Sequence, residues 1–157
     1  MKALVLYYSY SGNTDIIARK ISEALDCDIA RIQTVTPYSE DFDTVVKQSE
    51  KEIKKGYEPE IEQLTYNPED YDIVILGFPV WWYTFAPPVK TALSAVNWQA
   101  KAVYTFATNE GWIGHSFKDV KNACTGADVR PGLNVRFNER GLITSQAEID
   151  KWIGQIK

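Results

Sequence analysis

The sequence has few of the features that mark secreted, metal-binding or membrane proteins. Only Cys27 and Cys124 are cysteines, which is too few for a disulfide scaffold and lacks the spacing of a metal site. The apolar run nearest the start, 3–8, is shorter than a signal-peptide core. No stretch approaches the ~18 apolar residues that a membrane span needs. We therefore expect a soluble, cytoplasmic protein without a metal centre and without membrane contact.

The chain also lacks an excess of basic charge. It has 17 Lys and Arg residues against 21 Asp and Glu, a net charge of −4, and no basic run. This balance argues against nucleic acid as a partner. Residues 38–71 hold 10 acidic and 4 basic side chains, so this segment is more acidic than the whole chain. The segment is either a solvated surface or an electrostatic docking patch.

Motifs of several nucleotide-binding and phosphoryl-transfer classes are absent. The chain has neither GxxxxGK[ST] nor GxGxxG, which excludes a nucleoside-triphosphate loop and a dinucleotide fingerprint. No acidic residue precedes Asp15, which argues against a phospho-acceptor receiver domain. The turn that follows the first apolar segment contains no cysteine, so a thiolate phosphatase site is excluded there.

Hydrophobic patterning predicts one α/β domain over residues 1–157. Apolar runs at 2–8, 71–78 and 101–108 are typical of strands buried on both faces, and 28–34 and 129–137 read as a more exposed and an interrupted strand. Helical patterns cover 41–55, 87–96, 116–124 and 145–156, and Ile17, Ile21 and Leu25 mark one after the first strand. Strands alternating with helices predict a parallel sheet with helices on both faces.

A polar turn, residues 9–14 (SYSGNT), follows the first strand and leads into a helix. Ligands of open parallel sheets bind beyond the carboxyl ends of strands. The first N–H groups of a helix are unpaired and its dipole favours an anion. With no Lys or Arg between Ala3 and Ile17, a phosphate here would depend on hydroxyls and amides. The alternative is a polar turn that only caps the helix.

Residues 7–14 (YYSYSGNT) resemble the phosphate loop that binds flavin mononucleotide (FMN) in flavodoxins. The resemblance implies a three-layer α/β/α sandwich with a five-stranded parallel sheet of order 2-1-3-4-5. It implies FMN as cofactor. It also implies phosphate contacts from hydroxyls or amides of Ser9, Ser11, Asn13 and Thr14, and from the backbone N–H groups of Tyr10 and Gly12.

Three consecutive aromatic residues, 81–83 (WWY), follow the third strand. Neighbouring side chains in a loop diverge, so at least one of them is exposed or buried against a ligand. They could instead cap the domain or form a dimer contact. The segment 77–82 (GFPVWW), followed by Pro87 and Pro88, resembles short flavodoxin-like proteins with a G-[YF]-P-x-W-W loop. The resemblance places five residues against the flavin ring: Pro79, Val80, Trp81, Trp82 and Tyr83.

A second candidate ring-binding loop follows the fourth strand. Its glycines permit close backbone approach, and Trp112 is positioned to cover the other face of the ring. Flavodoxin-like proteins often have TSGGS here, so the sequence of this loop is a departure from the family pattern. Glu110 would disfavour a negatively charged reduced ring. His115, the single histidine, is expected to be a surface residue. The loop adds Thr108, Asn109, Glu110, Gly111 and Trp112 to the predicted cofactor site.

The resemblance leaves three functions open, and in none of them do we assign a catalytic residue. The first is a redox protein that passes electrons through FMN, at an exposed ring edge, to partner proteins. The second is an FMN-dependent NAD(P)H:quinone-type oxidoreductase, whose site would often be completed in a homodimer. The third is a flavodoxin-fold binding module without cofactor.

Overall fold

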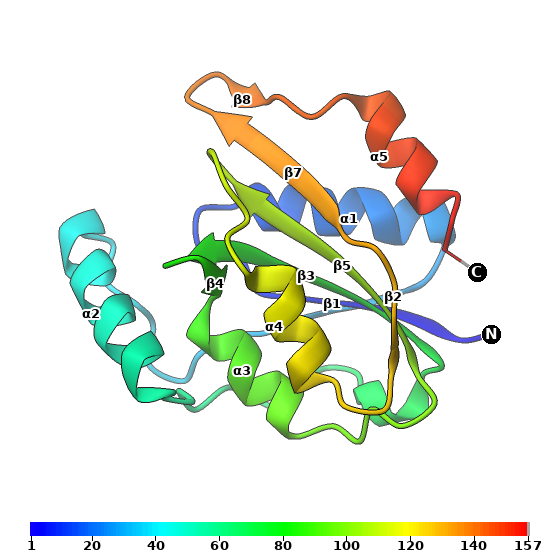
Figure 1. Ribbon diagram of the computed structural model, residues 1–157, viewed down its shortest axis with the longest axis horizontal. Helices are drawn as coiled ribbons and strands as arrows, with labels where there is room; N and C mark the ends of the chain where they lie inside the picture. The colour runs from blue at the N-terminus through cyan, green and yellow to red at the C-terminus, as the bar shows by residue number, and fades with distance from the viewer. Residues whose placement is uncertain (157) are drawn as a thin grey trace.

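The apolar segments of the sequence form the middle of one sheet in the computed structural model, which describes residues 1–156 (Figure 1). The strands are β1 (Ala3–Tyr7), β2 (Asp28–Arg31), β3 (Ile73–Trp81), β4 (Thr84–Phe85), β5 (Ala102–Asn109), β6 (Asp128–Val129), β7 (Leu133–Asn138) and β8 (Gly141–Leu142). The helices are α1 (Asn13–Leu25), α2 (Phe42–Lys55), α3 (Pro87–Ser94), α4 (Ser116–Ala123) and α5 (Gln146–Ile153), with a 3-10 turn, η1 (Pro68–Asp70). None of the described helices is long and apolar enough to cross a membrane.

The predicted order of the parallel strands is confirmed, but the predicted number of strands is wrong. The sheet runs β2-β1-β3-β5, and β6 and β7 both pair in parallel with β5 at the fifth position. Pro131 and Gly132 lie between these two strands; proline has no N–H for the ladder. Two short antiparallel strands, β4 against β3 and β8 against β7, bring the total to eight.

Helices cover both faces of the sheet, as predicted, because side chains alternate along each buried strand. Leu4 and Leu6 of β1 point into the core beneath α3 and α4, whereas Val5 and Tyr7 point into the core beneath α1 and α5. Figure 1 shows α2 at the side of this sandwich, next to the β3–β4 hairpin. Within residues 1–156, four helices therefore cover the faces of the sheet, and α2 lies beside one of its edges.

The carboxyl ends of β1, β3 and β5 meet at this edge, beside α2 (Figure 1). Two of the segments predicted as loops are shorter than expected. β3 continues to Trp81 because Val80 and Trp81 pair with β4, and β5 continues to Asn109 because it pairs with β7. Pro79, Val80, Trp81 and Asn109 are thus strand residues, and only the residues after Trp81 and Asn109 form turns.

Candidate functional site

The turn between β1 and α1 presents a group of unpaired backbone donors. Gly12 precedes the helix with φ 102°, a left-handed conformation that suits glycine, and its carbonyl accepts the first helical bond, from Ile16 at 3.1 Å. Within residues 1–156, the N–H groups of residues 10–14 donate no hydrogen bond to a protein acceptor. These donors lie at the positive end of the α1 dipole, which favours a bound anion.

Two of the hydroxyls predicted to bind phosphate already have partners in the protein. Ser9 Oγ accepts a hydrogen bond from the backbone N–H of Asp15 at 3.2 Å. Thr14 Oγ1 lies 2.7 Å from Thr108 Oγ1, and both threonines are buried. The side chains of Ser11 and Asn13 are more accessible. The Thr14–Thr108 contact joins the first predicted segment to the third, which brings two of the three segments together.

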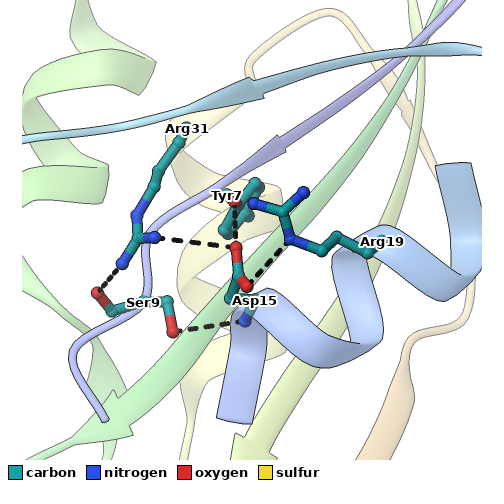
Figure 2. A network of polar contacts seen from close by, with 5 residues as sticks. All are labelled: Tyr7, Ser9, Asp15, Arg19 and Arg31. Carbon is teal, nitrogen blue, oxygen red and sulfur yellow. Dashed lines mark hydrogen bonds and ion pairs between the residues drawn. The ribbon is translucent and has the colours of Figure 1, made fainter. Parts of the chain in front are cut away.

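An ionic cluster lies against this turn (Figure 2). Asp15 accepts a hydrogen bond from the Tyr7 hydroxyl and another, of 3.0 Å, from Arg19 Nε. Arg31 lies 3.6 Å from the same carboxylate and donates to the backbone carbonyl of Ser9 at 3.2 Å. The turn itself contains no Lys or Arg, but the structure places the Arg31 side chain next to it. Sequence reasoning missed Arg31 because strand pairing, rather than chain proximity, brings it there.

The cluster holds its groups in defined protonation states. Partial burial opposes ionisation of Asp15, but hydrogen bonds from Tyr7 and Arg19 and the charges of Arg19 and Arg31 outweigh it, so the pKa of Asp15 lies below its ordinary value. Burial, followed by the bond to Asp15, raises the pKa of Tyr7 to about 12. The carboxylate stays ionised and the phenol stays a donor over the physiological pH range.

The β3–β4 hairpin has a two-residue turn with unusual backbone geometry. Trp82 and Tyr83 have φ values of 50° and 70°, both in the left-handed region that bulky residues rarely adopt. Positive φ at both positions is the pattern of a type I′ hairpin turn, which normally favours Asn or Gly. The Tyr83 carbonyl accepts a bond of 2.8 Å from the N–H of His115, and this contact fixes the turn against the start of α4.

Trp81 lies at the centre of a cluster of tyrosines. Its ring makes edge contacts with Tyr8, Tyr10 and Tyr38 at centroid distances of 5.8, 5.6 and 5.2 Å. The Tyr10 hydroxyl also donates to the carbonyl of Ser39 at 2.6 Å, so Tyr10 contributes its side chain to this wall as well as a backbone N–H to the turn. Trp81 is therefore a packed wall of the site.

An apolar cavity of about 460 Å³ lies between the hairpin, Trp112 and α2. Trp82 fixes one wall, because its indole N–H lies 3.1 Å from the carbonyl of Val46 and 3.2 Å from Ser49 Oγ. Trp112 is 65% exposed, and its ring lies 5.3 Å from that of Tyr83. The predicted lining residues are Tyr10, Val80, Trp81, Trp82, Tyr83 and Trp112; α2 adds Phe42, Val45, Val46 and Ser49.

Sequence reasoning missed the α2 wall, although the apolar positions Phe42, Val45 and Val46 stood out in an otherwise polar helix. The other residues predicted to bind the ring do not line this cavity; they are Pro79, Thr108, Asn109, Glu110 and Gly111. The Asn109 side chain instead donates to Asn134 at 2.6 Å and accepts from the N–H of Gly111 at 3.1 Å.

The titratable groups nearby have structural partners. His115 is exposed, as expected, and its Nδ1 contacts the Asp119 carboxylate, which also accepts a 2.5 Å bond from Thr84. This network attaches β4 to α4. At the other end of α4, burial raises the pKa of Cys124 to about 12, so its thiol stays protonated.

Known structures share this fold. A candidate flavoprotein from Bacteroides eggerthii has 27% identity and a TM-score of 0.83, with 99% of this chain and 97% of that chain covered. A flavoprotein from Lactobacillus acidophilus, crystallised in complex with FMN, has 27% identity and a TM-score of 0.77, with 96% and 97% covered. Oxidised flavodoxin 1 from Bacillus cereus, at 18% identity and a TM-score of 0.59 with 98% and 93% covered, shares the fold.

The sequence comparisons give the family. None of the curated protein sequences matches this chain. The sequence model of the flavodoxin family, in contrast, matches residues 2–156. The matched range includes the turn at 9–14, the hairpin and the loop that carries Trp112. This chain belongs to the flavodoxin family.

Proposed function

We propose that this protein binds FMN non-covalently and transfers electrons to and from partner proteins. The observation that carries the proposal is the position of the unpaired N–H groups of residues 10–14 beside the aromatic cavity, at one edge of the sheet. A phosphate monoester needs the first feature, and a flat, largely apolar ring needs the second. The FMN complex of the Lactobacillus acidophilus relative supports the same ligand.

The residues fit FMN in two groups. The phosphate group is held by the N–H groups of residues 10–14 and the side chains of Ser11 and Asn13, while Ser9 and Thr14 fix the shape of the turn. The ring is bordered by aromatic side chains and by the ends of β3 and β5. The ring-binding set in this proposal is Pro79, Val80, Trp81, Trp82, Tyr83, Thr108, Asn109, Glu110, Gly111 and Trp112.

In electron transfer, the role of the protein is to bind FMN and to shield its ring from water. FMN, when bound, supplies the one- and two-electron chemistry, and the protein supplies orientation and electrostatics. Trp81 and Trp82 exclude water from one side of the flavin ring, because contacts hold both side chains in place. Trp81 packs against the tyrosine cluster, and Trp82 bonds to α2. Trp112 and Glu110 are exposed, so the loop leaves an accessible edge and adds negative charge next to it.

The acidic segment 38–71 contributes less to this edge than its composition suggests. α2 has three acidic residues and four lysines, so the surplus lies outside the helix. Glu69 lies at the opposite edge of the sheet, where its carbonyl accepts a 3.0 Å bond from Lys101, just before β5. Partner recognition at the cavity then depends on aromatic contact more than on charge.

We place this electron transfer in the cytoplasm.

A second function is an FMN-dependent reductase for NAD(P)H and a quinone-type acceptor. The extension of the cavity toward α2 favours it, because Phe42, Val45 and Val46 provide an apolar surface for a second flat molecule. Stopped-flow mixing of the FMN-loaded protein with NADPH separates the two functions. Loss of the flavin absorbance within seconds supports the reductase; no loss over hours supports the carrier. Analytical ultracentrifugation tests whether the site is completed in a homodimer.

The first test is reconstitution with FMN. After incubation and desalting, we expect a retained flavin band with a shifted absorption maximum and quenched tryptophan fluorescence. Trp112→Leu is the informative variant, since this exposed ring has few contacts that matter for folding, and it should weaken binding while leaving the melting temperature unchanged. A colourless protein after desalting, with no quenching during titration, would contradict FMN binding and favour a binding module without cofactor.

A further inference from the structure

The phosphate-binding turn is held at both ends by one arginine. Ser9 and Asp15 lie immediately before and after residues 10–14, and they are joined by the 3.2 Å bond from the Asp15 N–H to Ser9 Oγ. Arg31 contacts the same two residues, through one terminal nitrogen to the Ser9 carbonyl at 3.2 Å and through the other to Asp15 at 3.6 Å. Figure 2 shows the guanidinium of Arg31 between these two groups.

Strand pairing fixes the position of Arg31. It is the last residue of β2 and pairs with Tyr7, the last residue of β1. The guanidinium lies over the Tyr7 ring, 5.9 Å from its centroid, and part of the side chain is accessible to solvent. The side chain therefore reaches the turn from a rigid strand, which is the condition for holding a binding site in one geometry.

The cluster has a surplus of positive charge. Asp15 carries one negative charge, and Arg19 and Arg31 carry one positive charge each. Glu40 lines the same shallow hollow as Arg31, but no ion pair joins them within residues 1–156. Arg31 contacts Ser9 and Asp15, the two residues that flank 10–14, so a phosphate bound to the N–H groups of that turn would lie close to the guanidinium. The two negative charges of the phosphate are attracted by this surplus, whereas a neutral ligand with the same ring is not.

We infer that Arg31 is a specificity-determining residue, which positions the turn and makes it select a phosphorylated flavin over the unphosphorylated one. The inference rests on the proposed function, because it concerns the phosphate end of the same site. It adds a charge contribution that the sequence of the turn itself does not contain, since no Lys or Arg lies between Ala3 and Ile17.

The test compares FMN with riboflavin, which shares the ring and lacks the phosphate. Dissociation constants of both are measured by fluorescence quenching, at low and high salt, for the wild type, Arg31→Gln and Arg31→Lys. Arg130→Gln is the matched control, because Arg130 also pairs with an aspartate, Asp128 at 2.7 Å, but at the opposite edge of the sheet. Circular dichroism and melting temperature show that each variant is folded.

We expect Arg31→Gln to weaken FMN binding about tenfold, the size of one charge-assisted contact, and to change riboflavin binding less than about twofold. FMN binding by Arg31→Gln should also depend less on salt concentration than FMN binding by the wild type. Arg31→Lys keeps the charge but cannot contact Ser9 and Asp15 with two parallel nitrogens, so it should recover part of the loss. Arg130→Gln should behave as the wild type.

Two results overturn the inference, and they are distinguishable. If folded Arg31→Gln retains the wild-type preference for FMN over riboflavin, Arg31 does not determine specificity, while the proposed function stands. If the wild type binds neither flavin, the proposed function fails and this inference fails with it. The first result includes an equal loss of FMN and riboflavin affinity in Arg31→Gln, which would show a structural role without selection for phosphate.

Discussion

The turn at residues 9–14 and the hairpin at residues 80–85 line the same edge of the sheet but are stabilised in different ways. The turn has an unobstructed left-handed glycine and is fixed by polar contacts from Ser9, Thr14 and Arg31. The hairpin places Trp82 and Tyr83 in left-handed backbone conformations and is fixed by packing against α2 and α4. The site thus combines a locally encoded polar half with an aromatic half that depends on distant segments.

The largest expected effect comes from filling the space beside the hairpin. A Cβ atom on Gly114 would lie 2.3 Å from the carbonyl oxygen of Tyr83, and Gly114 has a φ of 60°. Gly114→Ala should lower the free energy of unfolding by about 3 kcal/mol, because a backbone clash adds to the left-handed strain. Urea denaturation measures this loss.

Gly12→Ala is the matched change in the turn. Its φ is 102°, but a Cβ atom there has nothing within 4 Å. The expected loss is therefore only the conformational strain, about 1–2 kcal/mol. Equal losses for Gly12→Ala and Gly114→Ala would show that close packing does not distinguish the two halves of the site.

The second-largest expected loss of stability comes from removing the ring at the centre of the tyrosine cluster. Trp81→Leu removes the ring that contacts Tyr8, Tyr10 and Tyr38, and it should lower the free energy of unfolding by about 2 kcal/mol. Trp112→Leu is the control, and its effect on stability should stay within about 0.5 kcal/mol because this ring is 65% exposed. Chemical denaturation of the two variants measures the difference; a larger loss for Trp112→Leu would assign the packed wall to the wrong tryptophan.

The turn could be predicted from the sequence because its signals are adjacent: an apolar strand, small polar residues, a glycine and an amphipathic helix, all within residues 1–25. Local patterns also predicted a parallel sheet with a layer of helices on each face, whereas the order of its strands came from the resemblance to flavodoxins. It missed β4, because a Trp-Tyr pair lacks the Asn or Gly that normally signals a two-residue hairpin turn. It recognised the interruption of the fifth strand but counted β6 and β7 as one.

The contacts that complete the site are set by tertiary structure. Arg31 reaches Ser9 only because β2 pairs in register with β1, and no local pattern contains that register. Val46 and Ser49 contact Trp82 across more than thirty residues of chain. Thr108 was predicted from its place at the end of a strand, but no local pattern shows that its hydroxyl contacts Thr14. The resemblance of two segments to flavodoxins predicted the ligand class, and the partners of individual side chains required the three-dimensional structure.

A smaller effect is expected from loosening α2. Trp82→Phe keeps an aromatic ring but removes the indole N–H that contacts Val46 and Ser49, which should lower the free energy of unfolding by about 1 kcal/mol. Hydrogen exchange should accelerate in α2 and remain unchanged in α1, because only α2 is attached through this group. Faster exchange in both helices would mean that the two halves of the site are not independent.

The smallest effect at neutral pH is expected from Asp15→Asn. The amide side chain of this variant would keep a contact with Tyr7, and the exposed Arg19 pair contributes only about 0.3–0.5 kcal/mol. The informative result is the pH dependence. The native pKa of Asp15 is lowered, so its contribution to stability is fully present above the unfolded-state pKa of about 3.9 and is lost as the pH falls through the native value. Denaturation curves of the wild type and Asp15→Asn should therefore differ by a constant amount from about pH 5 to 8 and converge toward about pH 2. A difference that appears or disappears within that neutral range would assign the ionisation to another group and would remove the argument that Asp15 stays charged beside the turn.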